Sequence, residues 1–227
     1  MMEWSPILVS LKTALIAMAV TFLLGLWAAV RVHRMNNERL QQLIDSLLLL
    51  PLVLPPTVMG FLLLQVFGVR GPVGAFFLQF FQTKLVFSWI STVIASVVIA
   101  FPLMYRSARA AFDQVDPRLC EAARTLGMPE RHIIRRILLP AARPGLLSGG
   151  VLAFARGFGE YGATSMLAGN ILGKTRTLPL AVASEVAAGQ QDRAAVYVLI
   201  MLGISMILLL AMHRIGRSRV SGEEFRC

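Results

Sequence analysis

Long uncharged stretches alternate with short basic ones along this chain. A membrane-spanning helix needs about 20 predominantly apolar residues, and the long stretches predict spanning helices at residues 7–30, 46–69, 85–105, 144–167 and 194–212. A further apolar segment, Leu180–Ala188, is too short to cross a membrane, and we expect it to form a short surface helix. The pattern therefore predicts an all-α integral membrane protein with five transmembrane helices in a single domain, residues 1–227.

The distribution of basic residues orients these helices. The chain has 227 residues, of which 56% are hydrophobic, and a net charge of +10; so apolar a composition excludes an ordinary soluble domain. Fifteen arginines lie on one side of the membrane, within residues 31–39, 106–143 and 214–226, and five basic residues lie on the other. Because cytoplasmic loops carry the excess of Lys and Arg, we place the N-terminus outside and the C-terminus inside the cell. This rule explains the basic excess without a nucleic-acid partner.

A charged segment, residues 117–140, interrupts the apolar pattern and lies inside the cell in this orientation. Asp-Pro at residues 116–117 is typical of a helix start, and Gly127 is a suitable residue to end a short helix. A second, amphipathic helix follows, and we expect Leu139-Pro140 to end it. The charged segment is therefore predicted to be a cytoplasmic helix–turn–helix.

Two interpretations fit the charged segment. An ordinary amphipathic connector on the membrane surface would have a similar pattern, but the small residues Ala122 and Ala123 beside Glu121 favour insertion into a groove of a partner protein. The spacing also resembles the signature of the permease subunits of bacterial ABC importers. The positions that match are Glu121, Ala122, Ala123, Gly127, Ile137, Leu139 and Pro140.

This resemblance implies a type I ABC-importer permease fold with a cytoplasmic coupling helix. In that family the short helix docks into a cleft of a separate ATPase subunit, so the resemblance implies docking through residues 118–128, supported by residues 133–140. ATP and Mg would be bound by the ATPase subunit, and no cofactor by this chain. The permease would act as a homodimer in the membrane lipid, supplied by a periplasmic or extracellular binding protein.

Three further stretches resemble molybdate permeases in order and spacing. They are LLLLPLVLPPTVMG at residues 47–60, FARGFGEYGAT at residues 154–164 and TRTLP at residues 175–179. The resemblance implies a multi-pass molybdate permease of the bacterial cytoplasmic (inner) membrane. Tungstate and sulfate permeases share the architecture and stay open as alternatives. A secondary anion transporter that needs no ATP is the alternative from another class, and the charged segment argues against it.

Prolines within the second predicted span mark one candidate part of a substrate path. Pro55 and Pro56 free backbone carbonyls at membrane depth, which is tolerated where neighbouring helices or a water-filled path satisfy them. Thr57 or Gly60 would let the backbone approach such a path. A kink that only shapes helix packing explains the prolines equally well.

Two ionisable residues within the fourth predicted span mark another part. Arg156 and Glu160 are four residues apart, so we expect them to share a helix face, and ionisable groups inside a membrane are expensive. Arg156 would attract an oxyanion while Glu160 offsets its charge, and Thr164 is a further lining candidate. A buried ion pair that fixes helix packing is the alternative.

The remaining motifs add little chemistry. AGNILGKT at residues 168–175 is close to a phosphate-binding loop, but Ala168 replaces the first glycine and no strand precedes it. No metal cluster or catalytic constellation is visible in the sequence, so we expect a transport subunit and not an enzyme. Gly145 and Gly149 form a GxxxG pattern that permits close helix contact, for which dimer packing is one use.

Overall fold

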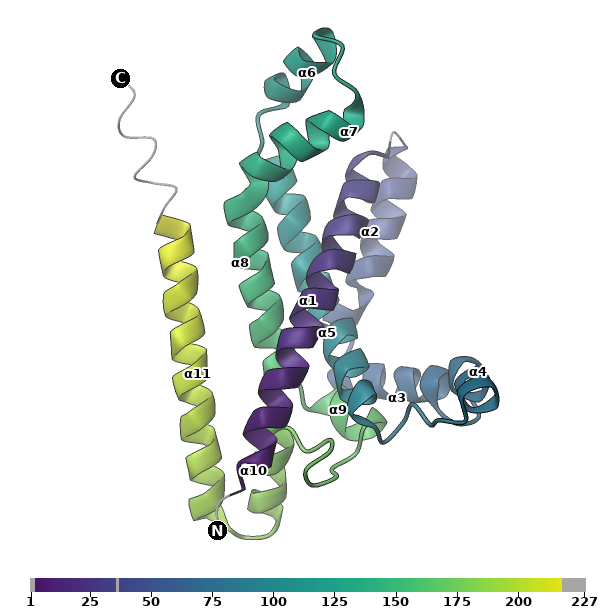
Figure 1. The fold of residues 1–227 in the computed structure, drawn as a ribbon, viewed down its shortest axis with the longest axis vertical. Coiled ribbons are helices and arrows are strands. Elements are labelled where there is room, and N and C mark those ends of the chain that lie inside the picture. Colours follow the sequence, from purple (N-terminus) through teal and green to yellow (C-terminus); the bar gives the residue numbers. More distant parts are fainter. Residues whose placement is uncertain (1–2, 36, 218–227) are drawn as a thin grey trace.

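The computed structural model describes residues 3–35 and 37–217, with side chains up to residue 210, and its regular structure there is helical (Figure 1). The elements, in order, are α1 (Ser5–His33), α2 (Glu38–Val53), α3 (Pro56–Phe67), α4 (Pro72–Phe81), α5 (Trp89–Asp113), α6 (Pro117–Thr125), α7 (Glu130–Ile133), the π-helical turn η1 (Ile134–Leu138), α8 (Leu139–Phe158), α9 (Gly162–Leu167), α10 (Leu178–Ala187) and α11 (Gln191–Arg217). The all-α prediction is confirmed for this part of the chain.

The centre of the bundle is α5, which packs between α1 and α8. Small residues allow the helix backbones to approach closely there. A Cβ added to Gly145 would lie 2.6 Å from the Cβ of Ala111, and one added to Gly149 would lie 2.6 Å from the Cβ of Ser107. The GxxxG pattern thus faces α5 of the same chain, so its use for dimer packing is wrong.

Four helical stretches are long and apolar enough to cross a membrane, or five if the bent pair α2–α3 is one span. The helix predicted at residues 46–69 is two helices that meet at an angle of 109°. Leu54, between them, is extended with ψ of 139°, because the residue before a proline avoids the helical region. The prolines therefore bend the chain within the predicted second span, and the lining of a substrate path by this segment stays a prediction.

The helix at the fourth predicted span, residues 144–167, begins and ends at other residues than predicted. The helix runs without a break from Glu130 to Phe158, so the prediction that Leu139-Pro140 ends a helix is wrong. The η1 turn precedes Pro140, and its wider coil lets the N–H of Leu139 bond to the oxygen of Ile134. Such a turn accommodates a proline ring that would clash in a regular helix. At the other end the helix stops nine residues before Leu167, and α9 begins after a short turn.

A helix that we did not predict, α4, occupies the connection at residues 70–84. Pro72 is the first residue of this helix, where proline favours a helix start. Phenylalanines four residues apart then pack against each other along α4, with ring centroids 4.6 Å apart for Phe76 and Phe80 and 5.2 Å apart for Phe77 and Phe81. The short helix predicted at Leu180–Ala188 is confirmed as α10.

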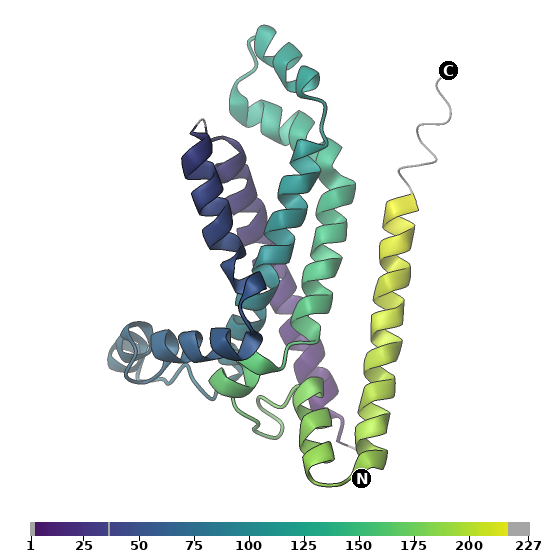
Figure 2. The same cartoon turned by 180° about the vertical axis from the view of Figure 1, so that it is seen from behind.

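The long helices place the charged segment far from the start of α1. Figures 1 and 2 show α6 and α7 at one end of the bundle and the first turn of α1 at the other, with α11 running toward the end that holds α6. In the predicted orientation, which stays a prediction, α6 and α7 lie in the cytoplasm and the α10–α11 turn lies outside.

Candidate functional site

The α6 helix is defined at both ends by local hydrogen bonds. At its start the Asp116 carboxylate accepts the N–H of Arg118 at 2.9 Å. At its end Gly127 takes a φ of +76°, and the N–H of Met128 bonds to the oxygen of Ala123 at 3.1 Å. This is the Schellman arrangement that a C-terminal glycine favours. The nine-residue helix therefore has a fixed length and a fixed exit direction.

An ion pair joins α6 to α7 across the turn between them. Arg124 Nε donates to Glu130 Oε1 at 2.6 Å, and this hydrogen bond raises the pKa of the Arg124 guanidinium above its ordinary value. Both side chains are about half exposed, so the pair adds little net stability. It connects the two helices across the turn at residues 126–129.

The exposed face of α6 differs from the predicted one. Ala123 is buried at 4% exposure, so the prediction that Ala122 and Ala123 form one outward small-residue face is wrong. Ala122 and Glu121 are exposed, and so are Leu119 and Leu126, at 52% and 81%. Leu119, Ala122 and Leu126 are spaced i, i+3, i+7, the spacing of a helix that inserts into an apolar groove. Sequence reasoning missed the two leucines although this spacing was visible.

The other signature residues lie where the charged segment joins α8. Ile137 is in η1, and Leu139 and Pro140 begin α8. Ile137 and Leu139 are partly buried and Pro140 is exposed. They lie on the continuous helix that leads away from α6, and not beside Glu121.

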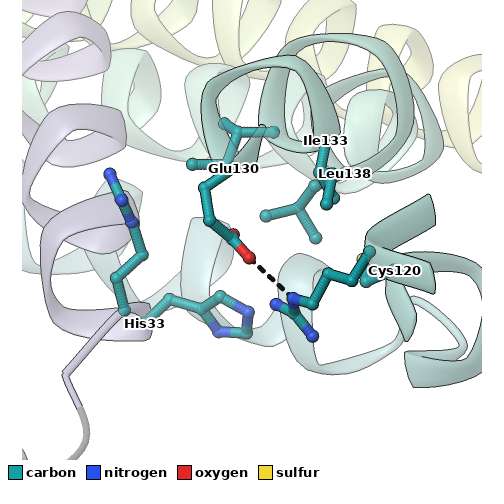
Figure 3. Close-up of a pocket in the computed structure, with 8 residues that line it drawn as sticks. His33, Cys120, Glu130, Ile133 and Leu138 are labelled. Atoms are coloured by element: carbon teal, nitrogen blue, oxygen red, sulfur yellow. Dashed lines mark hydrogen bonds and ion pairs between the residues drawn. The ribbon is translucent and has the colours of Figure 1, made fainter. Parts of the chain in front are cut away.

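A pocket of about 480 Å³ separates α6 and α7 from the end of α1 (Figure 3). Arg124 and Glu130 meet on one side of it, and His33 faces them from α1. Among the described residues no group of three or more His, Cys, Asp or Glu side chains is placed to hold a metal ion.

The predicted pair Arg156 and Glu160 does form, in a different setting. Arg156 is in the last turn of α8, and Glu160 lies beyond Gly159, which ends that helix, so the prediction of one shared helix face is wrong. Glu160 is 2% exposed; its Oε2 accepts from Arg156 Nη1 at 3.0 Å and its Oε1 accepts the N–H of Ala163 at 2.7 Å. The carboxylate therefore also caps the first turn of α9.

The two breaks in the bundle pack against each other. A Cβ added to Gly60 would lie 2.9 Å from the Cα of Ala163, and one added to Gly162 would lie 2.9 Å from the Cβ of Pro56. The structure thus brings Pro56 and Gly60 of α3 to α9, next to Glu160. Thr164, also on α9, is 1% exposed, and its hydroxyl has no hydrogen-bond partner among the described residues. Pro55 and Thr57 are exposed.

Comparison with known proteins covers nearly the whole chain. Residues 21–220 match the family described as the binding-protein-dependent transport system inner membrane component. The chain is 41% identical over 221 residues to the molybdenum transport system permease protein ModB of Escherichia coli K12, covering 96% of each chain. It is 40% identical over 210 residues to ModB of Haemophilus influenzae, covering 92% of this chain and 91% of that one.

Solved structures match in fold. A structure of the MetNI methionine ABC transporter, in an inward-facing conformation, has a TM-score of 0.74 at 18% identity, with 94% of each chain covered. A bacterial ABC transporter involved in import of the polysaccharide alginate has a TM-score of 0.70 at 15% identity, with 94% of this chain and 78% of that chain covered. At these identities the likeness concerns the arrangement of the helices.

Proposed function

The chain belongs to the family of binding-protein-dependent transport system inner membrane components, and we propose that it is the permease of an ATP-driven molybdate importer. It is a multi-pass protein of the cytoplasmic membrane and a transport subunit, not an enzyme. Support for molybdate comes from relatives named as molybdenum permeases that match along almost the full length of the chain. Tungstate and sulfate, which are tetrahedral dianions of the same charge, are the alternative substrates.

The observation that carries the proposal is the exposed face of α6. Leu119, Ala122 and Leu126 form an apolar stripe on α6 at the end of the molecule, and a stripe of this spacing suits a groove. Glu121 is exposed on another face of the same short helix. We propose that the groove belongs to an ATPase subunit that binds ATP and Mg, and that a separate binding protein delivers molybdate to the outer side. The working unit is a homodimer of this chain with two such ATPase subunits.

The helix from Glu130 to Phe158 supplies the mechanical connection in this proposal. It has 29 residues and a length of about 43 Å at 1.5 Å per residue, enough to cross the membrane. Its cytoplasmic end is joined to α6 by the short turn at residues 126–129, which the Arg124–Glu130 pair spans, and its outer end carries Arg156. When the ATPase subunits close, α6 moves and α8 transmits the displacement to Glu160 and α9.

The packed breaks at α3 and α9 are the proposed gate. The backbones touch at Gly60 and Gly162 with no room for a side chain, so a small shift of α9 must move α3. Arg156 is partly exposed while Glu160 is buried, so the guanidinium is the group that can meet a passing dianion. Glu160 balances its charge and limits how tightly the anion binds.

ATP hydrolysis in the assembled complex tests this function. We would purify the chain with its ATPase subunit, reconstitute it in vesicles and add binding protein loaded with molybdate. Loaded binding protein should stimulate hydrolysis, and Glu121→Arg should abolish both stimulation and co-purification of the ATPase, whereas Glu38→Arg, at the exposed start of α2, should abolish neither. Co-purification of an intact Glu121→Arg chain with the ATPase would contradict docking through α6.

A further inference from the structure

An apolar groove of about 510 Å³ runs between α1 and α8, away from the gate. Its walls include Met18, Ala19, Phe22 and Leu23 on α1 and Leu147 and Gly150 on α8. Its floor is the contact between the two helices, where a Cβ added to Gly150 would lie 3.3 Å from Cδ2 of Phe22. Because the walls are apolar and lie within spanning helices, hydrocarbon is the matching occupant.

Each wall of the groove ends in an arginine on the side of the charged segment. On α1, Leu23, Trp27 and Arg31 follow at intervals of four and so share a helix face, and the Arg31 guanidinium lies 5.2 Å from the centre of the Trp27 ring. On α8, Arg143 precedes Leu147 by four residues. Both arginines are exposed.

The two arginines lie at a similar depth. Arg31 is nine residues beyond Phe22, about 13 Å along α1, and Arg143 is seven residues before Gly150, about 10 Å along α8. Phe22 and Gly150 are in contact and the helices run in opposite directions, so both guanidiniums are on the cytoplasmic side of the groove. Within the described part of the chain no carboxylate pairs with either side chain.

We propose that this groove is a specific site for an anionic phospholipid of the inner leaflet. One acyl chain lies between α1 and α8, and the headgroup lies at the end of the groove where Arg31 and Arg143 are. Trp27 is then at the depth where tryptophan is enriched, between hydrocarbon and headgroups. A helix of a second copy would fill the groove but would leave the two cations without a counter-charge. The site depends on the helix arrangement and on the predicted membrane orientation, and it stands apart from the proposed transport function.

Quenching of Trp27 by brominated lipids tests the site. The full chain, with Trp4→Phe and Trp89→Phe, is reconstituted in phosphatidylcholine vesicles that hold a small fraction of either brominated phosphatidylglycerol or brominated phosphatidylcholine. Phosphatidylglycerol should quench Trp27 at lower fractions, with a preference of roughly fivefold for each arginine that meets the phosphate. Arg31→Gln with Arg143→Gln should abolish the preference. The matched control, Arg39→Gln with Arg106→Gln, removes two exposed charges elsewhere and should keep it.

The Trp89→Phe substitution removes the hydrogen bond that the Trp89 indole donates to Thr13 Oγ1. Native mass spectrometry therefore gives a second readout on a chain that keeps all three tryptophans. Wild-type chain should retain phosphatidylglycerol, and Ala19→Phe, which fills the groove without changing charge, should lose it. Equal quenching by the two lipids in the parent chain, or an unchanged preference in the double arginine variant, would overturn the proposal. Absence of quenching by both lipids would mean that another copy of the chain covers the groove, and would overturn it as well.

Discussion

Truncation of Leu126 to alanine isolates the apolar contact that α6 offers to the ATPase. Leu126 is 81% exposed, so docking can bury nearly the whole side chain. Complete burial of a leucine is worth roughly 1.5–3 kcal/mol. Alanine keeps the Cβ, so the substitution should remove about 1–2 kcal/mol of binding free energy, which weakens association about fivefold to thirtyfold.

The assay is equilibrium binding of purified ATPase subunit to the chain in lipid nanodiscs. The matched control is Leu8→Ala on α1, where the leucine is 67% exposed at the opposite end of the molecule. Neither substitution should change the melting temperature much, because neither leucine is buried. Wild-type affinity in Leu126→Ala, or equal losses in both variants, would refute the docking argument.

Three further substitutions test other parts of the account. Gly60→Val should stop molybdate uptake because its Cβ would lie 2.9 Å from the Cα of Ala163. The control Gly203→Val, whose Cβ would meet nothing within 4 Å, should leave uptake unchanged. Normal uptake by Gly60→Val would exclude the proposed gate. Glu160→Ala should lower the melting temperature more than Glu160→Gln, because glutamine still accepts the Ala163 N–H, and equal melting temperatures would argue against the capping role. Gly127→Ala, strained at a φ of +76°, should cost about 1 kcal/mol locally and weaken ATPase binding in nanodiscs, while the helix content measured by circular dichroism stays the same.

Local signals accounted for what the sequence predicted correctly. The spans at α1, α5 and α11 follow from long apolar runs, and most helix ends lie within a few residues of the predicted ones. The caps of α6 at Asp116 and Gly127 depend on residues within one turn of the helix end, so they too could be read from the chain alone. The predicted pairing of Arg156 with Glu160 is confirmed for the same reason, because the two residues are close in sequence.

Features that depend on distant partners could not be predicted. Pro55 predicted a kink, but not the size of the bend, 109°. The contact of α3 with α9 joins residues about a hundred positions apart. Pro140 looked like a helix end because nothing in the sequence revealed that the preceding turn widens. Ala123 could not be assigned to the inner face before the position of α7 was known.

ATP-driven accumulation of molybdate in sealed vesicles tests the central claim most directly. The vesicles would hold this chain with its ATPase subunit, and binding protein would be added on the side that corresponds to the cell exterior. We predict uptake against a gradient that requires ATP on the ATPase side, is lost with Leu126→Asp, and persists when proton and sodium gradients are collapsed. Uptake that proceeds without the ATPase and follows an ion gradient would contradict the account.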